Sequence, residues 1–147
     1  MSITAPRVTA WLAGLWAGVL WGVGLIGAPA GFATTLPETA GRVAGRMFVQ
    51  EAYLSLVLGL VLFLMLRKIA SAAAEAGTGS VFDTNMLLAL GAMFCTVAGY
   101  FAVQPMMASA RAGQGPVSFG ALHAISAGFY LLKAVLVSVL AWRLAPR

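Results

Sequence analysis

Four long runs of apolar residues dominate the pattern of hydrophobic and polar positions along the chain. They cover about residues 8–32, 43–66, 86–108 and 119–142. Each exceeds the roughly 18 residues that mark a membrane-spanning helix, which at about 1.5 Å per residue crosses a hydrocarbon core of about 30 Å. None of them alternates with the period of two that β-barrel strands show. The pattern predicts an all-α integral membrane protein, an antiparallel four-transmembrane-helix bundle in a single domain of residues 1–147.

The polar stretches between these runs contain helix-capping signals. Thr35 and Glu38 have the three-residue spacing of a capping box at the start of the second helix. Asp83 or Thr84 is suited to cap the third helix, and Ser118 is suited to cap the fourth, because their side-chain oxygens can accept a bond from a free backbone N–H. These short connections predict that consecutive helices are antiparallel neighbours.

The composition agrees with lipid as the solvent of this chain. Hydrophobic residues make up 61% and charged residues 9% of the sequence, against about 45–50% and about 25% in soluble proteins. A soluble domain of this size has too little interior to hide so much apolar surface. The net charge of +5 would suit nucleic acid, but the nine Lys and Arg are scattered singly beside apolar runs. We therefore expect the lipid bilayer as the partner, and no nucleic acid.

Loop charges predict the orientation. More basic residues lie on the side of the termini and of the longest predicted loop, residues 67–82, than on the other side. The positive-inside rule then places both termini of this multi-pass membrane protein in the cytoplasm. The first side carries Arg7, Arg67, Lys68, Arg143 and Arg147, and the second carries Arg42, Arg46 and Arg111.

Small residues recur at every fourth position in three of the predicted helices. Such faces let helix backbones approach closely in a membrane, where packing rather than hydrophobicity holds helices together. We favour contacts within one bundle, with a homo-oligomer through the glycine-rich faces as the alternative, and interpret Cys95 as a small packing residue. The three sets are Gly14, Gly18 and Gly22; Gly91, Cys95 and Gly99; and Gly120, Ala124 and Gly128.

Polar and ionisable side chains within the predicted spans form a candidate buried cluster. Those of the fourth helix fall within an arc of about 80°, and others recur at helical spacing on the second and third helices. Ionisable residues are costly inside a membrane, so such a cluster is a candidate functional site. Its members are Arg46, Gln50, Glu51, Tyr100, Gln104, His123, Ser126, Tyr130 and Lys133.

Depth along the predicted helices indicates which members meet. At about 1.5 Å per residue from the outer helix ends, Glu51 and Tyr100 lie about 12–14 Å deep. His123 and Gln104 lie about 6–8 Å deep, and Lys133 about 22 Å. We therefore expect the partner of Glu51 among His123, Tyr100 and Gln104, with Lys133 as the floor. Two interpretations stay open: the cluster only fixes helix register, or it serves a ligand, a proton or a metal.

Metal-ligating residues are scarce. One histidine and one cysteine cannot form a zinc site from protein ligands alone. Seven methionines raise the idea of copper(I), a soft ion that thioethers bind, but methionine is also a common packing residue. We predict no metal and no cofactor.

Four segments carry a resemblance to a known family: residues 28–33 (APAGFA), 44–54 (AGRMFVQEAYL), 97–107 (VAGYFAVQPMM) and 119–126 (FGALHAIS). They resemble the bacterial branch of the transmembrane-protein-205-like domain family, a domain of unknown function. Ala124 replaces the Gly that the family has after the histidine. That family is distantly similar to the copper-resistance D proteins and the HemJ-type protoporphyrinogen oxidases, which implies a four-helix unit. HemJ-type enzymes use a histidine early in the first helix, where this chain has Trp11, so the resemblance implies a fold and no reaction.

Three hypotheses follow for the function. The first is a non-enzymatic carrier, transport or assembly module that uses the buried polar cluster. The second is a membrane oxidoreductase or a haem- or copper-handling protein similar to the HemJ and copper-resistance D types. The third is a structural partner in a larger membrane complex.

Overall fold

The computed structural model describes residues 4–146, which form α-helices interrupted by two π-helical segments. Arg147, one of the residues behind the orientation prediction, lies outside the described residues. In chain order the segments are α1 (Thr4–Trp21), η1 (Gly22–Gly27), α2 (Ala28–Thr34), α3 (Pro37–Glu75), α4 (Thr84–Thr96), η2 (Val97–Ala102), α5 (Val103–Arg111) and α6 (Phe119–Leu144).

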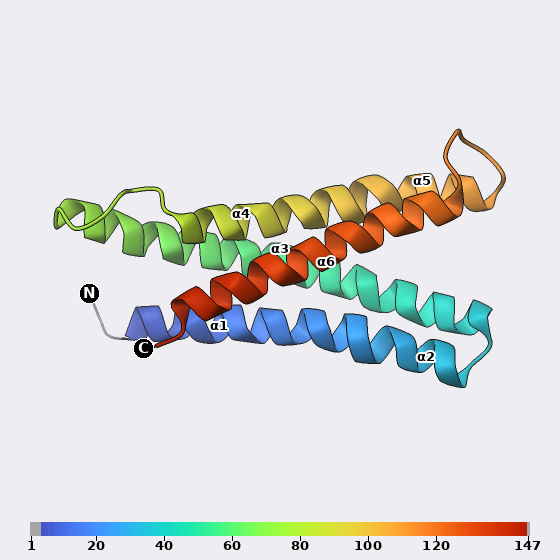
Figure 1. Ribbon diagram of the computed structural model, residues 1–147, viewed down its shortest axis with the longest axis horizontal. Helices are drawn as coiled ribbons and strands as arrows, with labels where there is room; N and C mark the ends of the chain where they lie inside the picture. Colours follow the sequence, from blue (N-terminus) through green and yellow to red (C-terminus); the bar gives the residue numbers. More distant parts are fainter. Residues whose placement is uncertain (1–3, 147) are drawn as a thin grey trace.

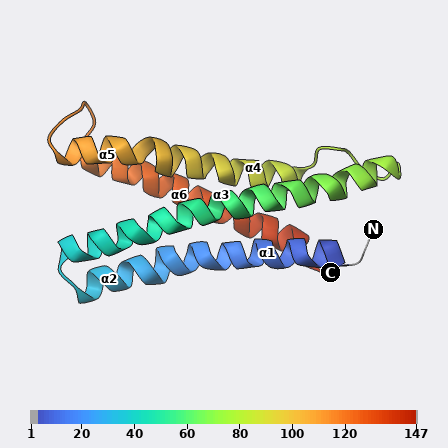
Figure 2. The same cartoon turned by 180° about the vertical axis from the view of Figure 1, so that it is seen from behind.

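These segments build four helices, each long and apolar enough to cross a membrane. The first is α1–η1–α2, the second α3, the third α4–η2–α5 and the fourth α6. They run antiparallel, which confirms the predicted all-α four-helix bundle (Figure 1). Both ends of the described chain lie at one end of the bundle, the proximal end. The α2–α3 and α5–α6 connections lie at the other, the distal end (Figures 1 and 2).

The second helix is much longer than predicted. It begins at Pro37 instead of residue 43 and ends at Glu75 instead of residue 66. The prediction of a loop at residues 67–75 was wrong because this stretch is rich in alanine, the strongest helix former. With 39 residues α3 is about 58 Å long, and its last turns project beyond the proximal end of the bundle (Figures 1 and 2).

Two of the predicted helix caps are present and one is not. The Asp83 side chain accepts a bond from the backbone N–H of the third residue after it, at 2.9 Å, and Ser118 does the same for α6 at 3.2 Å. The Thr35 capping box was wrong: its hydroxyl donates backward to the Gly31 carbonyl at 2.9 Å. Leu36 holds the N-cap position, because a residue before proline is driven out of the helical conformation.

The main hydrophobic core lies in the proximal half, where α1, α3, α4 and α6 pack together. Most of its members are small or branched apolar side chains, and Trp16 is the largest side chain that is fully buried. The buried members are Ala13, Trp16, Leu20, Leu62, Leu66, Ala70, Met86, Ala89, Ala92, Ala134, Val137 and Leu140.

The distal half is more open. There α2 packs on α3, and α5 packs on α6, while the two pairs diverge toward the distal end (Figures 1 and 2). A small separate core between α5 and α6 consists of Val103, Met107 and Leu122. The two pairs of helices are therefore held together mainly by the proximal core.

The glycine face of the first helix does not pack within the bundle. A Cβ atom built on Gly14, Gly18 or Gly22 would meet no other atom within 4 Å. The prediction of close contact there was wrong, because α1 turns the face with Ala13 and Trp16 toward its neighbours instead. The same holds for α6, where Cβ atoms on its two glycines at positions 120 and 128 would also meet nothing.

The third helix does use its small residues for packing. A Cβ atom on Gly91 would lie 3.2 Å from Leu136 of α6, and one on Gly99 would overlap Phe129. The expectation of close approach within the bundle is thus confirmed for these two glycines. Small residues in η2 and α4 bring α6 close to the third helix.

Candidate functional site

A cavity of about 360 Å³ lies between the two diverging helix pairs of the distal half, and we call it the distal cleft. Its two long walls differ in chemistry. The wall from η1, α2 and α3 is apolar except for one carboxylate, and the wall from α4, η2, α5 and α6 is mostly polar. The first consists of Gly24, Ala28, Pro29, Phe32, Phe48 and Glu51. The second consists of Cys95, Thr96, Gly99, Tyr100, Gln104, Met107, His123, Ser126, Ala127, Tyr130 and Lys133.

The exposed members of the lining show where the cleft opens. Pro29 and Phe32 of α2 and His123 and Ala127 of α6 are exposed. The side of the cleft between α2 and α6 is therefore open. We expect this side to face lipid in a membrane, because it lies between helices that are long and apolar enough to cross one.

The floor of the cleft is a buried ion pair. The Lys133 Nζ of α6 donates to both carboxylate oxygens of Glu51 on α3, at 2.7 and 2.9 Å. The two residues are 2% and 4% exposed. Each lies 14 residues into its helix from the distal end, which places both about 21 Å deep at about 1.5 Å per residue.

The partner expected for Glu51 was therefore wrong. We expected His123, Tyr100 or Gln104, and the structure pairs Glu51 with Lys133. The cause is the start of α3 at Pro37. A start six residues earlier moves Glu51 about 9 Å deeper, away from the level of Tyr100 and to that of Lys133.

A chain of hydrogen bonds behind the ion pair fixes the position of Glu51. The Trp16 Nε1–H donates to the Ser55 hydroxyl at 2.8 Å, and Ser55 donates to Oε1 of Glu51. An indole can only donate, so the proton of Ser55 must point to the carboxylate. Glu51 thus accepts bonds from both sides, as an ionised carboxylate does. Buried charges are tolerated when they are paired and hydrogen-bonded in this way.

The polar side chains His123, Ser126, Tyr130 and Lys133 form a stripe along α6, and two of them make hydrogen bonds at the π-helical segments. The Tyr130 hydroxyl donates to the Leu20 carbonyl next to η1 at 2.7 Å, and the Ser126 hydroxyl donates to the Gly99 carbonyl within η2 at 2.7 Å. A Cβ atom on Gly24 would lie 2.9 Å from the Tyr130 ring, so glycine lets the ring reach this carbonyl. Single π turns inside helices are frequent at functional sites, and here both line the same cleft.

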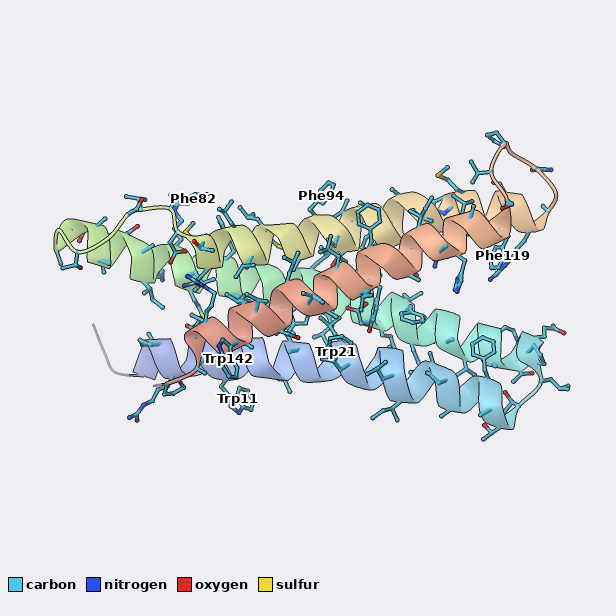
Figure 3. The ribbon with its side chains drawn as sticks, viewed as in Figure 1. Trp11, Trp21, Phe82, Phe94, Phe119 and Trp142 are labelled. Carbon is cyan, nitrogen blue, oxygen red and sulfur yellow. The ribbon has the colours of Figure 1, made fainter. Side chains whose placement is uncertain are left out.

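The mouth of the cleft carries a stack of a cation and two rings. The guanidinium carbon of Arg111 lies 4.5 Å from the centre of the Phe119 ring. This ring stacks on His123 with centroids 5.9 Å apart. Figure 3 shows Phe119 near the distal end of α6. The stack places positive charge beside the opening of the cleft.

The structure brings seven of the nine predicted cluster residues to the cleft and leaves two outside. Arg46 and Gln50 are exposed and do not line it. On α3 they lie about 140° and 100° around the helix from Glu51, on the face of Tyr53, which packs edge-on against Phe101. The residues in the cleft are Glu51, Tyr100, Gln104, His123, Ser126, Tyr130 and Lys133.

Sequence reasoning missed several residues of the site. Trp16 and Ser55 complete the ion-pair network, and the four-residue spacing of Ser55 from Glu51 was a signal that could have found the second. Phe48 and Phe32, which give the cleft its apolar wall, have no signal that separates them from lipid-facing side chains. Cys95, interpreted as a packing residue, lines the cleft.

Metal ligands do not gather in the described part of the chain. Among residues 4–146 no group of three or more His, Cys, Asp or Glu side chains is placed to hold a metal ion. The cleft itself contributes one histidine, one cysteine and one carboxylate, the last of which is bound to Lys133.

Comparison with known proteins supplies a family and no activity. Searches of curated proteins and of solved structures found no match. A family model for a domain of unknown function, DUF4149, matches residues 11–116, and α6 with its polar stripe lies beyond the matched range. Because the match covers more than two thirds of the chain, this membrane protein belongs to the DUF4149 family.

Proposed function

We propose that this protein is a membrane carrier or binding module that takes up a small amphipathic molecule in the distal cleft. The observation that carries this proposal is the difference between the two walls, one apolar and one polar, that converge on a buried ion pair. A polar head group is suited to the α6 wall. An apolar chain is suited to the wall of α2 and Phe48.

The lateral opening supports a ligand that arrives through the membrane. A molecule whose chain stays in the bilayer can insert its head group between α2 and α6 without leaving the lipid. The volume of about 360 Å³ is at the lower end of the range of small-molecule sites, about 300–1,000 Å³. It holds a head group and the first part of a chain, and the rest of a long chain remains in the bilayer.

Cys95 provides a direct test, because it is the only cysteine of the chain and lines the cleft. The measurement is the rate of its modification by N-ethylmaleimide in phosphatidylcholine nanodiscs. We expect at least one of four dodecyl amphiphiles to slow this rate saturably: dodecanoate, dodecyl phosphate, dodecanol or dodecyltrimethylammonium. If none of them does so, the proposed binding function is wrong.

Two matched controls separate binding from general effects on the membrane. Ala127 and Ala124 are both exposed on α6, but only Ala127 lines the cleft. Ala127→Trp should slow modification of Cys95 several-fold, and Ala124→Trp should leave it unchanged. The second control places the reporter cysteine outside the cleft, as Val97→Cys in a Cys95→Ala background. Position 97 is exposed and lies at nearly the same depth in the helix as Cys95. It should be insensitive to the amphiphiles.

We also propose that the protein lies in a bacterial inner membrane with both termini in the cytoplasm. The excess of basic residues on the side of the termini and of residues 67–82 supports this orientation. A reporter fused to the C-terminus tests it: cytoplasmic activity is expected, and periplasmic activity would reverse the assignment.

The other hypotheses stay predictions. A relation to the transmembrane-protein-205-like, copper-resistance D or HemJ-type proteins would favour a haem- or copper-handling role. A Soret band or bound copper in the purified protein would support it. Stoichiometric co-purification of another membrane protein would support a structural role in a complex.

A further inference from the structure

We propose that the head group bound in the distal cleft is an oxyanion, a carboxylate or a phosphate, one oxygen of which accepts a hydrogen bond from Lys133. This inference rests on the proposed function, because it names the chemical class of the ligand of the same cleft. It follows from the hydrogen bonds that the carboxylate, the ammonium group and most of the hydroxyl groups of the lining already make.

The one acidic group of the lining is engaged at both of its oxygens. Both oxygens of Glu51 accept bonds from Lys133, and Oε1 also accepts from Ser55. The direction of the Ser55 bond is fixed by Trp16, which donates to it. A cationic head group would therefore find a carboxylate that is already neutralised, with the ammonium group of Lys133 beside it.

Three of the four hydroxyl groups of the lining are engaged as donors, and the fourth belongs to Tyr100. Thr96, Ser126 and Tyr130 each donate their single proton to a backbone carbonyl, at 3.0, 2.7 and 2.7 Å. They keep lone pairs that can accept a weak bond, and they carry no charge. The head group thus meets neutral oxygens from α4 and α6 and the ammonium group of Lys133 at the floor.

Lys133 retains a donor for the ligand. An ammonium group has three N–H donors, and in the described part of the chain only the two oxygens of Glu51 accept from this one. Its Nζ lies 4.9 Å from the centre of the Tyr130 ring, so the third N–H has at most a weak aromatic partner. Lys133 lines the cleft, and an incoming oxyanion would supply the missing acceptor.

The mouth of the cleft carries positive charge. Arg111 lies over Phe119, which stacks on His123 at the opening. The carboxylate of Glu38, in the first turn of α3, forms an exposed ion pair with Arg42 at 3.6 Å. An oxyanion would pass positive charge at the mouth and reach the third N–H of Lys133 at the floor. A cation would be repelled at the mouth and would find at the floor a carboxylate that is already paired with Lys133.

The charge series of amphiphiles on the native protein is the primary experiment. The measured quantity is the concentration that halves the rate of Cys95 modification at pH 8. We expect dodecanoate and dodecyl phosphate to protect at a concentration at least tenfold lower than dodecanol, the difference that one charge-assisted hydrogen bond produces. Dodecyltrimethylammonium should protect least. Inorganic phosphate serves as the anionic probe that has no alkyl chain.

The outcomes separate this inference from the proposed function. Protection by the cation or by dodecanol at the same concentration as the anions, or at a lower one, would overturn the oxyanion and leave the binding function intact. Protection by inorganic phosphate alone would support an oxyanion as the bound group and would overturn the proposal that the ligand is a membrane amphiphile. Protection by none of the probes would overturn both.

A double variant tests the role of Lys133 in particular. Glu51→Gln with Lys133→Gln removes both charges together, so that no buried charge is left alone. The half-protecting concentration of the two anions should rise at least tenfold, while that of dodecanol should change less than twofold. Equal changes for all probes would show that Lys133 does not select the charge. If this variant does not fold, the charge series on the native protein decides by itself.

Discussion

The two halves of this bundle use the same four helices in opposite ways. In the proximal half the helices meet through small side chains, such as Ala13, Ala89 and Ala92, which are completely buried. In the distal half the helices separate in pairs, and the space between them is lined by polar groups on one wall. Packing holds the first half together, and the second half leaves room for a ligand.

The fourth helix shows where the change occurs. On the proximal side of the ion pair, α6 contributes Ala134, Val137 and Leu140 to the main core. On the distal side, it contributes Ser126 and Tyr130 to the cleft. Lys133 stands at the boundary, paired with Glu51. The change of chemistry along one helix thus coincides with the change from close packing to an open cleft. Variants can then alter stability and the proposed binding separately.

The largest expected effect comes from breaking the pair at this boundary. Lys133→Met leaves the Glu51 carboxylate buried and alone, which should cost about 3–5 kcal/mol. Replacing both residues, Glu51→Leu with Lys133→Met, should restore most of that stability. The free energy of unfolding in mixed micelles, titrated with sodium dodecyl sulfate, is measured for Lys133→Met, Glu51→Leu and the double variant. If the two single losses simply add in the double variant, the pair is not an energetic unit.

The sequence predicts which residues gather at the site better than it predicts which of them form pairs. The four spans, their antiparallel order and seven of the nine cluster residues follow from hydropathy and helical spacing. The pairing within the cluster did not follow, because it depends on helix ends. Pro37 starts α3 six residues before the apolar run, and this shift decides whether Glu51 meets Lys133 or His123.

Other parts of the site lie beyond hydropathy altogether. No sequence pattern distinguishes a phenylalanine that lines a cleft from one on the outer surface of the bundle. Phe48 lines the cleft, whereas Phe94 is 64% exposed. Figure 3 shows Phe94 pointing away from the bundle. The glycine spacing was misleading for a similar reason. Periodicity identifies a face of α1, but which face turns inward depends on the bulk of Trp16, which is fully buried.

The second effect in size should come from filling the proximal core. A Cβ atom on Gly59 would lie 2.5 Å from Met93 and 3.2 Å from Trp16, so a larger side chain must push α3 away from its neighbours. Gly59→Leu should cost about 3 kcal/mol, at the upper end of the range for overpacking. The same titration in micelles measures it. A loss below about 0.5 kcal/mol would show that the proximal half is not closely packed.

A smaller effect distinguishes two similar tryptophans. Trp16 donates to Ser55 at 2.8 Å and Trp21 donates to Ser138 at 2.9 Å, and in Figure 3 Trp21 points toward α6. Only the serine bonded to Trp16 leads on to the ion pair, whereas Ser138 donates to a backbone carbonyl. Trp16→Phe should cost about 2 kcal/mol and Trp21→Phe about 1 kcal/mol. Equal losses would show that the network adds nothing to the contact of the indole.

The smallest effect is expected at Gly18. This residue is exposed, and a Cβ atom there would meet nothing within 4 Å. A leucine at this position would exchange one lipid-facing surface for another and would improve helix propensity. Gly18→Leu should therefore change the free energy of unfolding by less than about 0.5 kcal/mol, in contrast to Gly59→Leu. Unfolding in mixed micelles, combined with the molecular mass of the protein–detergent complex, checks this. A large loss of stability accompanied by a loss of mass would show that this face contacts a second copy of the chain, so that the packing by small residues seen in the proximal half would continue between molecules.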